Sequence, residues 1–317
     1  MRLLVTGATG FLGAHLLQRL SGENVSVAIL VRPGANAWRI EHLRPRLTEI
    51  TGDLKEPRAF ADAVREFAPE AVAHLAWSGV GNRHRNDLSQ VEDNLFSSLE
   101  LFKIAREAGC RVWLALGSQA EYGPLNARIS EDAPTRPTTL YGAAKLSACV
   151  LSEQLCKQLD VRFVWLRLFS SYGPMDEPGW MIPHLILKLL ARERPSLTKG
   201  TQRWDYIYAA DVAEAIYLTL ITPEASGVFN LGSGEAHTLR HIVERVRDLI
   251  DPSLPLGFGE VPFREDQVMH LEADIARLRA LGWSARVPLE EGLAKTVEWY
   301  RDNWHRDNRD KLSDRSG

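Results

Sequence analysis

Cysteine is scarce in this chain of 317 residues, and the thiols that occur do not form a metal-binding pattern. Cys110, Cys149 and Cys156 share no metal-like spacing with one another or with the nine scattered histidines. An odd number of cysteines without a signal peptide is typical of reduced thiols in the cytoplasm. We therefore expect a cytoplasmic protein, and we expect no metal site.

Long apolar runs and a strong net charge are also lacking. No stretch reaches the roughly 18 uninterrupted apolar residues that a membrane-spanning helix needs, so no membrane span is expected. The apolar stretch at the N-terminus breaks at Gly7, too soon for a signal peptide. A net charge of −3 gives no electrostatic reason to expect nucleic acid or an anionic membrane as a partner. What remains is a composition ordinary for a globular protein, long enough for one large domain or two modest ones.

Apolar, β-rich segments alternate with helical patterns over the first two thirds of the chain. The expected strands are Arg2–Thr6, Val25–Val31, Leu47–Ile50, Ala71–Leu75, Arg111–Leu116 and Arg162–Leu168. The expected helices are Phe11–Leu20, Arg58–Phe67, Leu88–Ala108 and Tyr141–Leu159. Several strands are apolar nearly throughout, which is typical of strands buried on both faces. The alternation predicts an α/β fold, a doubly wound parallel sheet with helices on both sides.

The pattern changes after about residue 170, where helices are separated by short strands and by loops rich in proline and glycine. The expected helices are Met181–Ala191, Asp211–Ile221, Leu239–Leu249 and Leu289–Tyr300, and the expected strands are Tyr206–Tyr208, Val228–Leu231 and Leu256–Gly259. We predict a smaller, interwoven C-terminal α/β lobe over residues 171–304, with some strands rejoining the main sheet. Residues 305–317 are mostly charged or polar and are predicted to be a frayed tail.

A glycine-rich turn follows the first expected strand. Gly7, Gly10 and Gly13 recur at every third position before a helix begins. Glycine permits a tight turn and the close approach of a diphosphate to backbone N–H groups, and the helix N-terminus adds partial positive charge. Glycines can also serve the turn alone, but a strand before them and a helix after them are the context of a dinucleotide site. We therefore predict a Rossmann-type dinucleotide-binding domain over residues 1–170, its sheet completed by later segments.

The end of the second expected strand bears on which nicotinamide cofactor is bound. An acidic residue there would hydrogen-bond the adenosine ribose, whereas an arginine would meet a 2′-phosphate. This chain has Arg32 and no acid, which favours NADP(H), although NAD(H) stays possible because Arg32 could also be a solvated surface residue. After the third strand, Asp53 could lie by the adenine amino group.

Tyr141 and Lys145 stand four residues apart, a spacing that puts both side chains on one face of a helix. A phenol normally loses its proton near pH ~10, too high for an acid or base at neutrality. A neighbouring ammonium group favours the phenolate and lowers the phenol's pKa. The pair is therefore a candidate proton-transfer device, against the simpler reading of a core tyrosine beside a solvated lysine.

The motifs taken together resemble the extended short-chain dehydrogenase/reductases, the family of nucleotide-sugar epimerases, dehydratases and 4-ketoreductases. The resemblance covers roughly residues 1 to 300. Its motifs are Thr6–Gly13, Gly52–Leu54, His74–Ala76, Asp93–Asn94, Ser118 with Tyr122–Gly123, Tyr141 with Lys145, Leu166–Phe169, Tyr172–Pro174, Asp205–Tyr208 before Asp211, and Phe229–Gly234. Each motif is weak, but their joint occurrence in this order is specific.

The resemblance implies three catalytic residues, Ser118, Tyr141 and Lys145. Tyr141 would be the acid/base, Lys145 would lower its pKa and hold the nicotinamide ribose, and Ser118 would hydrogen-bond the reacting oxygen. The expected cofactor-binding residues are Gly7, Thr9, Gly10, Phe11, Leu12, Gly13, Arg32, Asp53, Leu54, Leu75, Ala76, Asn94, Tyr141 and Lys145. The expected substrate-binding residues are Ser118, Gln119, Ser170, Arg203 and Arg264.

The substrate residues follow the family pattern unevenly. Arg264 matches a family arginine that holds the sugar-nucleotide diphosphate, a charge-assisted contact. Arg203 is one place out of register, because Trp204 intervenes before Asp205, and Ser170 stands where the family often has asparagine. The basic loop Trp77–Asn86 either overlooks the sugar or is simply solvated.

Two departures from the family pattern bear on which of the family's reactions this chain could catalyse. The family's dehydratases carry an Asp-Glu pair directly after the Ser/Thr position, where this chain has Gln119 and Ala120, and Glu121 is one place out of register. The fucose-synthase type of 3,5-epimerase uses a cysteine near the sugar, and none flanks Ser118. Both of these activities are therefore disfavoured.

Our preferred function from the sequence is an NADPH-dependent reductase of a nucleotide-linked 4-keto-6-deoxyhexose, with Tyr141 as the proton donor. An NAD-dependent nucleotide-sugar 4-epimerase is the alternative, and Arg32 tilts the choice towards reduction. Reduction of a small non-sugar carbonyl and non-catalytic dinucleotide sensing stay open as further alternatives. The expected partner is a nucleotide-diphosphate sugar, and a homodimer through Leu88–Ala108 and Tyr141–Leu159 is common in the family.

Overall fold

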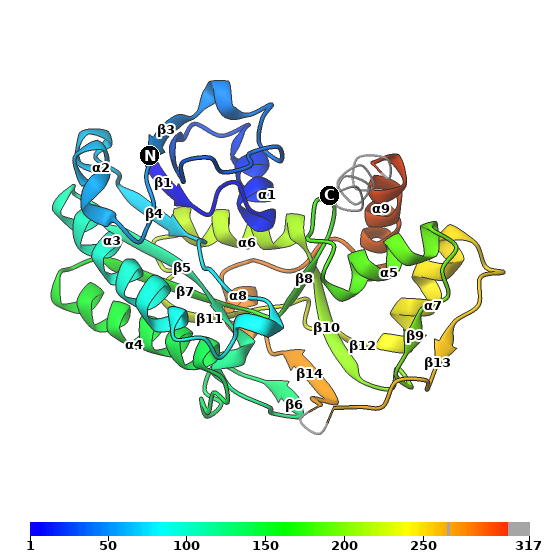
Figure 1. Ribbon diagram of the computed structural model, residues 1–317. Coiled ribbons are helices and arrows are strands. Elements are labelled where there is room, and N and C mark those ends of the chain that lie inside the picture. The colour runs from blue at the N-terminus through cyan, green and yellow to red at the C-terminus, as the bar shows by residue number, and fades with distance from the viewer. Residues whose placement is uncertain (265–266, 304–317) are drawn as a thin grey trace.

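The computed structural model describes residues 1–264 and 267–303 (Figure 1). The predicted frayed tail, residues 305–317, lies outside this range. Within the described residues, seven parallel strands form the main sheet in the order β11-β7-β5-β4-β1-β2-β3. They are β1 (Arg2–Thr6), β2 (Ser26–Val31), β3 (Thr48–Thr51), β4 (Ala71–His74), β5 (Val112–Ser118), β7 (Arg162–Leu168) and β11 (Gly227–Leu231). The predicted α/β fold with a doubly wound parallel sheet is confirmed.

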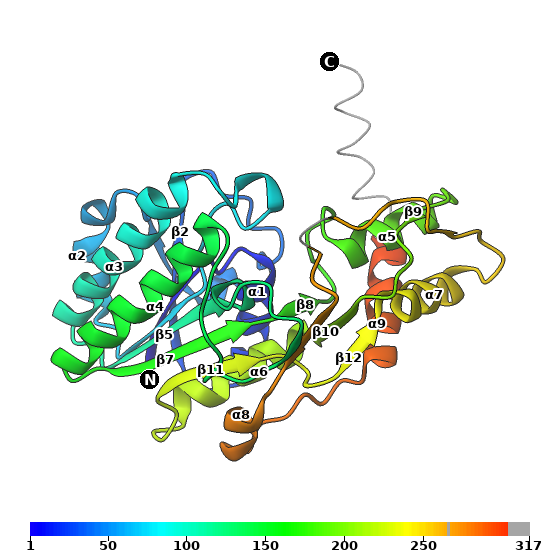
Figure 2. The ribbon, with the colours of Figure 1, turned by 90° about the horizontal axis from the view of Figure 1, so that it is seen from below.

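Helices cover both faces of the main sheet because its strands are apolar on both faces. On β5, Trp113 packs towards α2 (Ala61–Phe67), α3 (Phe96–Glu107) and α4 (Leu140–Gln158). The next residue, Leu114, packs on the opposite side with α1 (Phe11–Leu20) and α6 (Ala209–Ile221). This alternation is the two-residue period of a strand buried on both sides. Figure 2 shows α2, α3 and α4 side by side along one edge of the molecule.

The smaller lobe has a mixed sheet in which β10 (Arg203–Tyr208) pairs with three neighbours. These are β8 (Ser170–Tyr172) and β14 (His270–Ala273), both parallel, and β12 (Ala236–Thr238), which is antiparallel. β14 also pairs with β6 (Ala127–Ile129). A separate core lies between α5 (Met181–Leu190), α7 (Leu239–Ile250) and α9 (Leu289–Asp302), with the short pair β9 (Ser196–Leu197) and β13 (Gly257–Phe258) at its edge. The remaining helix, α8 (Ala276–Ala280), follows β14.

The two lobes are interwoven, as predicted. β6 belongs to the smaller sheet although it precedes α4 in the sequence. β11, which follows β10, belongs to the edge of the main sheet. β8 follows β7 directly, so the chain passes from one sheet into the other within a few residues. The C-terminal ends of the main strands therefore face the smaller lobe (Figure 1).

The predicted helix Leu88–Ala108 differs from the structure, which has a π-helical turn at Gln90–Leu95 before α3 begins. Two buried amides explain the difference. Gln90 Nε2 donates to the carbonyls of Gly79 and His84, and Asn94 exchanges two hydrogen bonds with the backbone of Ser78. These side chains draw the loop after β4 against the helix, and π-helical turns are frequent at such functional positions.

Asp205 on β10 joins the smaller sheet to its loops. Its carboxylate is fully buried and accepts hydrogen bonds from the backbone N–H groups of Ser233, Gly234 and Ala273, and from the Ser233 hydroxyl. We predict that Asp205→Ala lowers the free energy of unfolding by about 3 kcal/mol, because buried N–H donors lose their acceptor. Denaturant unfolding measures this loss. Asp62→Ala, at an exposed carboxylate on α2, is the control, and equal stability of the two variants would contradict the prediction.

Candidate functional site

A cleft of about 820 Å³ lies between the two lobes. Its walls begin where the main strands end: Gly7 follows β1, Arg32 follows β2, Leu75 follows β4, and Ser118 ends β5. β1 and β4 are neighbours from which the strand order runs in opposite directions, and open α/β sheets bind ligands at such a switch point. The predicted site residues that line it are Gly7, Gly10, Phe11, Leu12, Gly13, Arg32, Leu75, Ser118, Gln119, Tyr141, Lys145, Ser170 and Arg264.

The glycine turn fits a dinucleotide diphosphate. Gly7 adopts φ +72°, and a Cβ there would lie 2.7 Å from the backbone nitrogen of Ala76. A Cβ at Gly13 would overlap the Gly7 carbonyl oxygen, so α1 packs closely on the turn. Gly10 caps α1 without any side chain, which leaves the first N–H groups of the helix open towards the cleft. A helix N-terminus of this kind binds phosphate groups.

The remaining predicted cofactor residues surround the cleft without lining it. Asn94 holds Ser78 in the loop after β4, as described above, and the Ala76 N–H donates to the Thr6 hydroxyl. The Thr9 carbonyl accepts from Arg39, and Leu54 packs against the core beneath α2 and α3. Asn94 and Ala76 therefore shape the wall of the site from behind.

The rim near β2 and β3 is rich in charge. Arg32 is exposed there, and Asp53 accepts a hydrogen bond from the backbone of Lys55. The Lys55 ammonium pairs with Asp93 at 2.7 Å, and this contact raises the pKa of Lys55 while nearby Arg32 opposes the increase. Two cations therefore lie close together where the adenosine end of a dinucleotide is expected.

Ser118, Tyr141 and Lys145 meet in the cleft, as the sequence predicts. The Thr139 side chain caps α4, which places Tyr141 in the first turn of the helix and Lys145 one turn further on. The Lys145 ammonium donates to the Leu116 carbonyl at 2.6 Å and lies 3.8 Å from the centre of the Trp77 ring. The Ser118 side chain lies near the Tyr141 phenol and favours a lower pKa of that phenol.

Burial is the main cause of the pKa shifts of Tyr141 and Lys145. Loss of hydration raises the pKa of Tyr141, and the Ser118 side chain and the charge of Arg85 only partly oppose it. Loss of hydration also lowers the pKa of Lys145 to about 7. The Lys145 ammonium group is directed to Leu116 and Trp77 in this structure, and the expectation that Lys145 lowers the pKa of Tyr141 stays a prediction.

Glu121 does not reach the cleft. It is fully buried, and its carboxylate accepts from the Ser118 N–H at 2.8 Å and from the Arg167 guanidinium at 2.7 Å. The Trp165 indole N–H also donates to it. A carboxylate held in this way cannot act on a substrate, so the residue nearest in sequence to a dehydratase acid is structural here.

The predicted substrate residues divide into two sets. Gln119, Ser170 and Arg264 line the cleft, as noted above. Arg203 does not: its guanidinium donates to the Ala236 carbonyl at 2.7 Å. On β10 the alternation of side chains instead directs Trp204 and Tyr206 into the cleft. With Trp204 directly before Asp205, Trp204 and not Arg203 lines the cleft.

Several cleft residues were not singled out from the sequence. Trp77 and Arg85 come from the basic loop after β4, and Asp176 and Trp180 come from the segment before α5. Only the loop gave a signal, its basic composition. Asp176 is 5% exposed, and burial raises its pKa to about 7. Nothing in the local sequence marks this aspartate, because its burial depends on contacts between the lobes.

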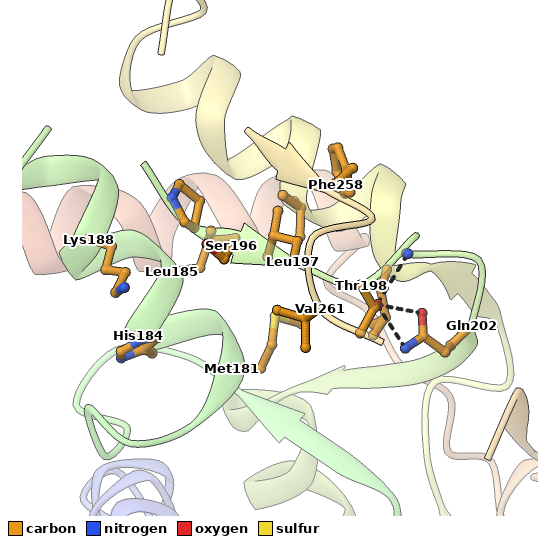
Figure 3. Close-up of a pocket in the computed structure, with 14 residues that line it drawn as sticks. Met181, His184, Leu185, Lys188, Ser196, Leu197, Thr198, Gln202, Phe258 and Val261 are labelled. Atoms are coloured by element: carbon orange, nitrogen blue, oxygen red, sulfur yellow. Dashed lines mark hydrogen bonds between the residues drawn. The ribbon is translucent and has the colours of Figure 1, made fainter. Parts of the chain in front are cut away.

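A second, mostly apolar pocket of about 290 Å³ adjoins the cleft within the smaller lobe (Figure 3). α5 contributes Met181 and Leu185, β9 contributes Leu197, and β13 contributes Phe258. Figure 3 shows Thr198 and Gln202 at one side, joined by hydrogen bonds. Met181 lines both cavities, so the pocket and the cleft are adjacent parts of one surface.

The sequence matches the model of a known family. The model of the NAD dependent epimerase/dehydratase family matches residues 3–232, well over half of the chain. The chain therefore belongs to this family of NAD(P)-dependent enzymes that act on nucleotide sugars, as its motifs indicated.

Individual relatives include both dehydratases and epimerases. The chain is 27% identical to dTDP-D-glucose 4,6-dehydratase of Mus musculus over 324 residues, covering 96% of this chain and 90% of the mouse protein. The crystal structure of UDP-glucose 4-epimerase from Thermus thermophilus with NAD is similar, with a TM-score of 0.85 at 26% identity, covering 95% of this chain and 99% of that one. MoeE5 in complex with UDP-glucuronic acid and NAD gives a TM-score of 0.82 at 29% identity, covering 96% of this chain and 100% of MoeE5.

Neither a membrane span nor a metal cluster occurs in the part of the chain that the structure describes. No helix in residues 1–264 and 267–303 is long and apolar enough to cross a bilayer. The same residues contain no group of three or more His, Cys, Asp or Glu side chains that could hold a metal ion.

Because the pKa of Lys145 is low in the folded protein, the free energy of unfolding should depend on pH. Between about pH 7 and the ordinary lysine value of 10.5, the unfolded chain binds a proton at Lys145 that the folded protein lacks. The contribution of Lys145 to stability therefore rises with pH across this window, by up to about 1.4 kcal/mol per pH unit. We predict that Lys145→Met removes this slope, measured by denaturant unfolding at several pH values.

Lys295→Met is the control for this experiment, since Lys295 is half exposed on α9. It should leave the pH dependence of the native protein unchanged. A Lys145→Met variant that keeps the native pH dependence would show that Lys145 is charged when folded.

Proposed function

We propose that the protein transfers hydride at C4 of a nucleotide-linked hexose and acts as a nucleotide-sugar 4-epimerase. The observation that supports this most is the gathering of Ser118, Tyr141 and Lys145 at the strand ends beside the glycine turn, with Gln119 and Ala120 after Ser118 in place of a dehydratase's two acids. A bound nicotinamide dinucleotide would supply and accept the hydride.

The three side chains can perform the accompanying proton transfer. Tyr141, as the phenolate, would take the proton of the C4 hydroxyl as that carbon is oxidised, and the resulting phenol would return the proton on reduction. Ser118 would hydrogen-bond the same oxygen, since it lines the cleft beside the phenol. Lys145 would bind the nicotinamide ribose, and its ammonium group would then exchange the Leu116 carbonyl for the ribose hydroxyls.

The two cavities suit the two ends of the substrate. The sugar would occupy the cleft next to Tyr141, where Gln119 and Trp180 supply polar and aromatic contacts. Arg264 would bind the diphosphate. The base would enter the apolar pocket past Met181, where Leu197 and Phe258 would pack on its faces. Polar groups at one side of an otherwise apolar pocket are typical of small-molecule sites.

The choice of reaction differs from our preference on sequence grounds. That preference was the 4-ketoreductase, based on Arg32. The solved relatives that bind NAD include UDP-glucose 4-epimerases that align over nearly the whole chain, which favours the epimerase alternative. A NADPH-dependent 4-ketoreductase is the second candidate, supported by Arg32 and the neighbouring Lys55 at the rim.

The homodimer stays a prediction, and exposed apolar residues on α3 and α4 support it. Phe96 on α3 is 58% exposed, and Val150 and Leu151 on α4 are also exposed. The two helices lie side by side (Figure 2).

The proposed activity predicts the behaviour of Tyr141→Phe. We expect conversion of UDP-glucose or another nucleotide hexose to its C4 epimer without added reductant, and a loss of about a hundredfold or more in the variant, because the phenol's proton is gone. Nuclear magnetic resonance of the sugar measures the conversion. Thermal shifts with NAD(H) and NADP(H) should persist in the variant, because it still folds and binds the cofactor. Oxidation of NADPH by nucleotide-linked 4-keto sugars, without any epimerisation, would replace the proposal by the second candidate.

The second candidate depends on Arg32. If Arg32 contacts a 2′-phosphate, Arg32→Ala should weaken NADPH binding about tenfold, the effect of losing one charged hydrogen bond, and leave NADH binding unchanged. Fluorescence titration of both reduced cofactors gives the two affinities. Arg46→Ala, at an exposed arginine before β3, controls for the lost charge. Equal losses for both cofactors, or none, would remove the support for an NADPH-dependent reductase.

A further inference from the structure

The loop between β4 and α3 is attached to the helix that carries Tyr141. The Tyr141 N–H donates to the Arg85 carbonyl at 2.8 Å, and the Leu140 N–H donates to the Asn86 side chain at 3.1 Å. These N–H groups belong to the first turn of α4 and have no partner within the helix. Arg85 is therefore held in a constant position relative to Tyr141 by backbone contacts.

The guanidinium group of Arg85 lies over the ring of Tyr141. Its guanidinium carbon lies 5.3 Å from the ring centre, and its Nε donates to the Val80 carbonyl at 3.2 Å. Both Arg85 and Tyr141 line the cleft. A guanidinium within about 6 Å of an aromatic ring is attracted to its face, and it favours negative charge on the phenol oxygen.

The other charged groups near the phenol are less suited to this role. Lys145, on the next turn of α4, is bound to Leu116 and Trp77, and burial lowers its pKa to about 7. Glu121, in the turn after β5, acts against the phenolate, although Arg167 on β7 pairs with it. A guanidinium stays protonated throughout the working pH range. Arg85 is therefore the permanent cation facing Tyr141 among the residues that the structure describes.

We propose that Arg85 is a positioning residue of the catalytic site, whose fixed charge favours the phenolate form of Tyr141 and so sets the pH range of proton transfer. The assignment deepens the proposed function, because it concerns the same proton transfer. It adds a second cation to the expected action of Lys145 on the phenol. Lys145 would also bind the cofactor, whereas the Arg85 charge comes from a loop outside α4.

The experiment follows the titration of one phenol without any substrate. Ultraviolet difference absorbance of each protein against the same protein with Tyr141→Phe isolates the Tyr141 signal. In Arg85→Gln we expect ionisation to move to higher pH by about half a unit to two units, as Coulomb's law gives over this distance for the dielectric constants of water and of a protein surface. The folded state of Arg85→Gln should persist, because the helix cap uses the backbone carbonyl of Arg85.

Two further variants separate charge from structure. Arg85→Lys keeps the positive charge and should restore most of the shift. Arg83→Gln removes the same charge from the same loop, where Arg83 is exposed and does not line the cleft, and should leave the titration unchanged. If Arg85→Gln unfolds, Arg85→Met provides the uncharged side chain of similar length.

The pH profile of turnover gives the second readout. The rise of kcat with pH should move upwards in Arg85→Gln together with the phenol titration. The inference is overturned if Tyr141 titrates alike in the native protein, Arg85→Gln and Arg85→Met, or if only Lys145→Met moves it. A shifted titration in a protein that converts no nucleotide sugar would leave the Arg85 assignment standing and remove the proposed function.

Discussion

The buried ion pair between Glu121 and Arg167 is the contact on which the site depends most. Glu121 ends the turn after β5 and accepts a hydrogen bond from the Ser118 N–H, so Ser118 is positioned by a buried carboxylate. Arg167 in turn lies 4.6 Å from the ring centre of Tyr122, whose hydroxyl donates to Asn230 at 2.6 Å. Asn230 on β11 donates to the Ile129 carbonyl of β6 at 2.8 Å. One polar network therefore connects three strands of the main sheet with the first strand of the smaller one.

A buried ion pair adds little to stability compared with an apolar pair, but losing one partner is costly. What the ion pair provides here is a fixed orientation of the Glu121 carboxylate. The Trp165 indole and the Ser118 backbone each use a remaining lone pair of Glu121, so the carboxylate has one orientation. The same contacts remove this acid from the reaction. A family that includes dehydratases can thus use an acid after the catalytic serine for chemistry, whereas this chain uses its nearest acid as a support.

Sequence reasoning predicted most of the main sheet because its signals are local. β1, β7 and α1 have the expected bounds, and the other main strands differ by one or two residues at their ends. The short strands β6, β8 and β14 were not predicted, since three or four residues are too few to show a period and their pairing is between distant segments. The same limit applies to the site. Gly7, Tyr141 and Lys145 stand in recognisable motifs. Trp77 and Arg85 become site residues only through the contacts of their loop with α4, and Asp176 only when the lobes meet.

The spacing of Tyr141 and Lys145 could not show that both side chains lose their hydration when the chain folds. Spacing places Lys145 near Tyr141, and in water the ammonium would lower the pKa of the phenol. In the folded protein both groups are almost fully buried, so the cost of losing hydration exceeds their mutual effect and moves both towards their neutral forms. Epimerase and reductase need the same arrangement at C4. They differ in whether the dinucleotide leaves after each turnover. Arg32 lies at one end of the cleft, and Arg39 joins Thr9 to Met175 and Glu177 across the two lobes.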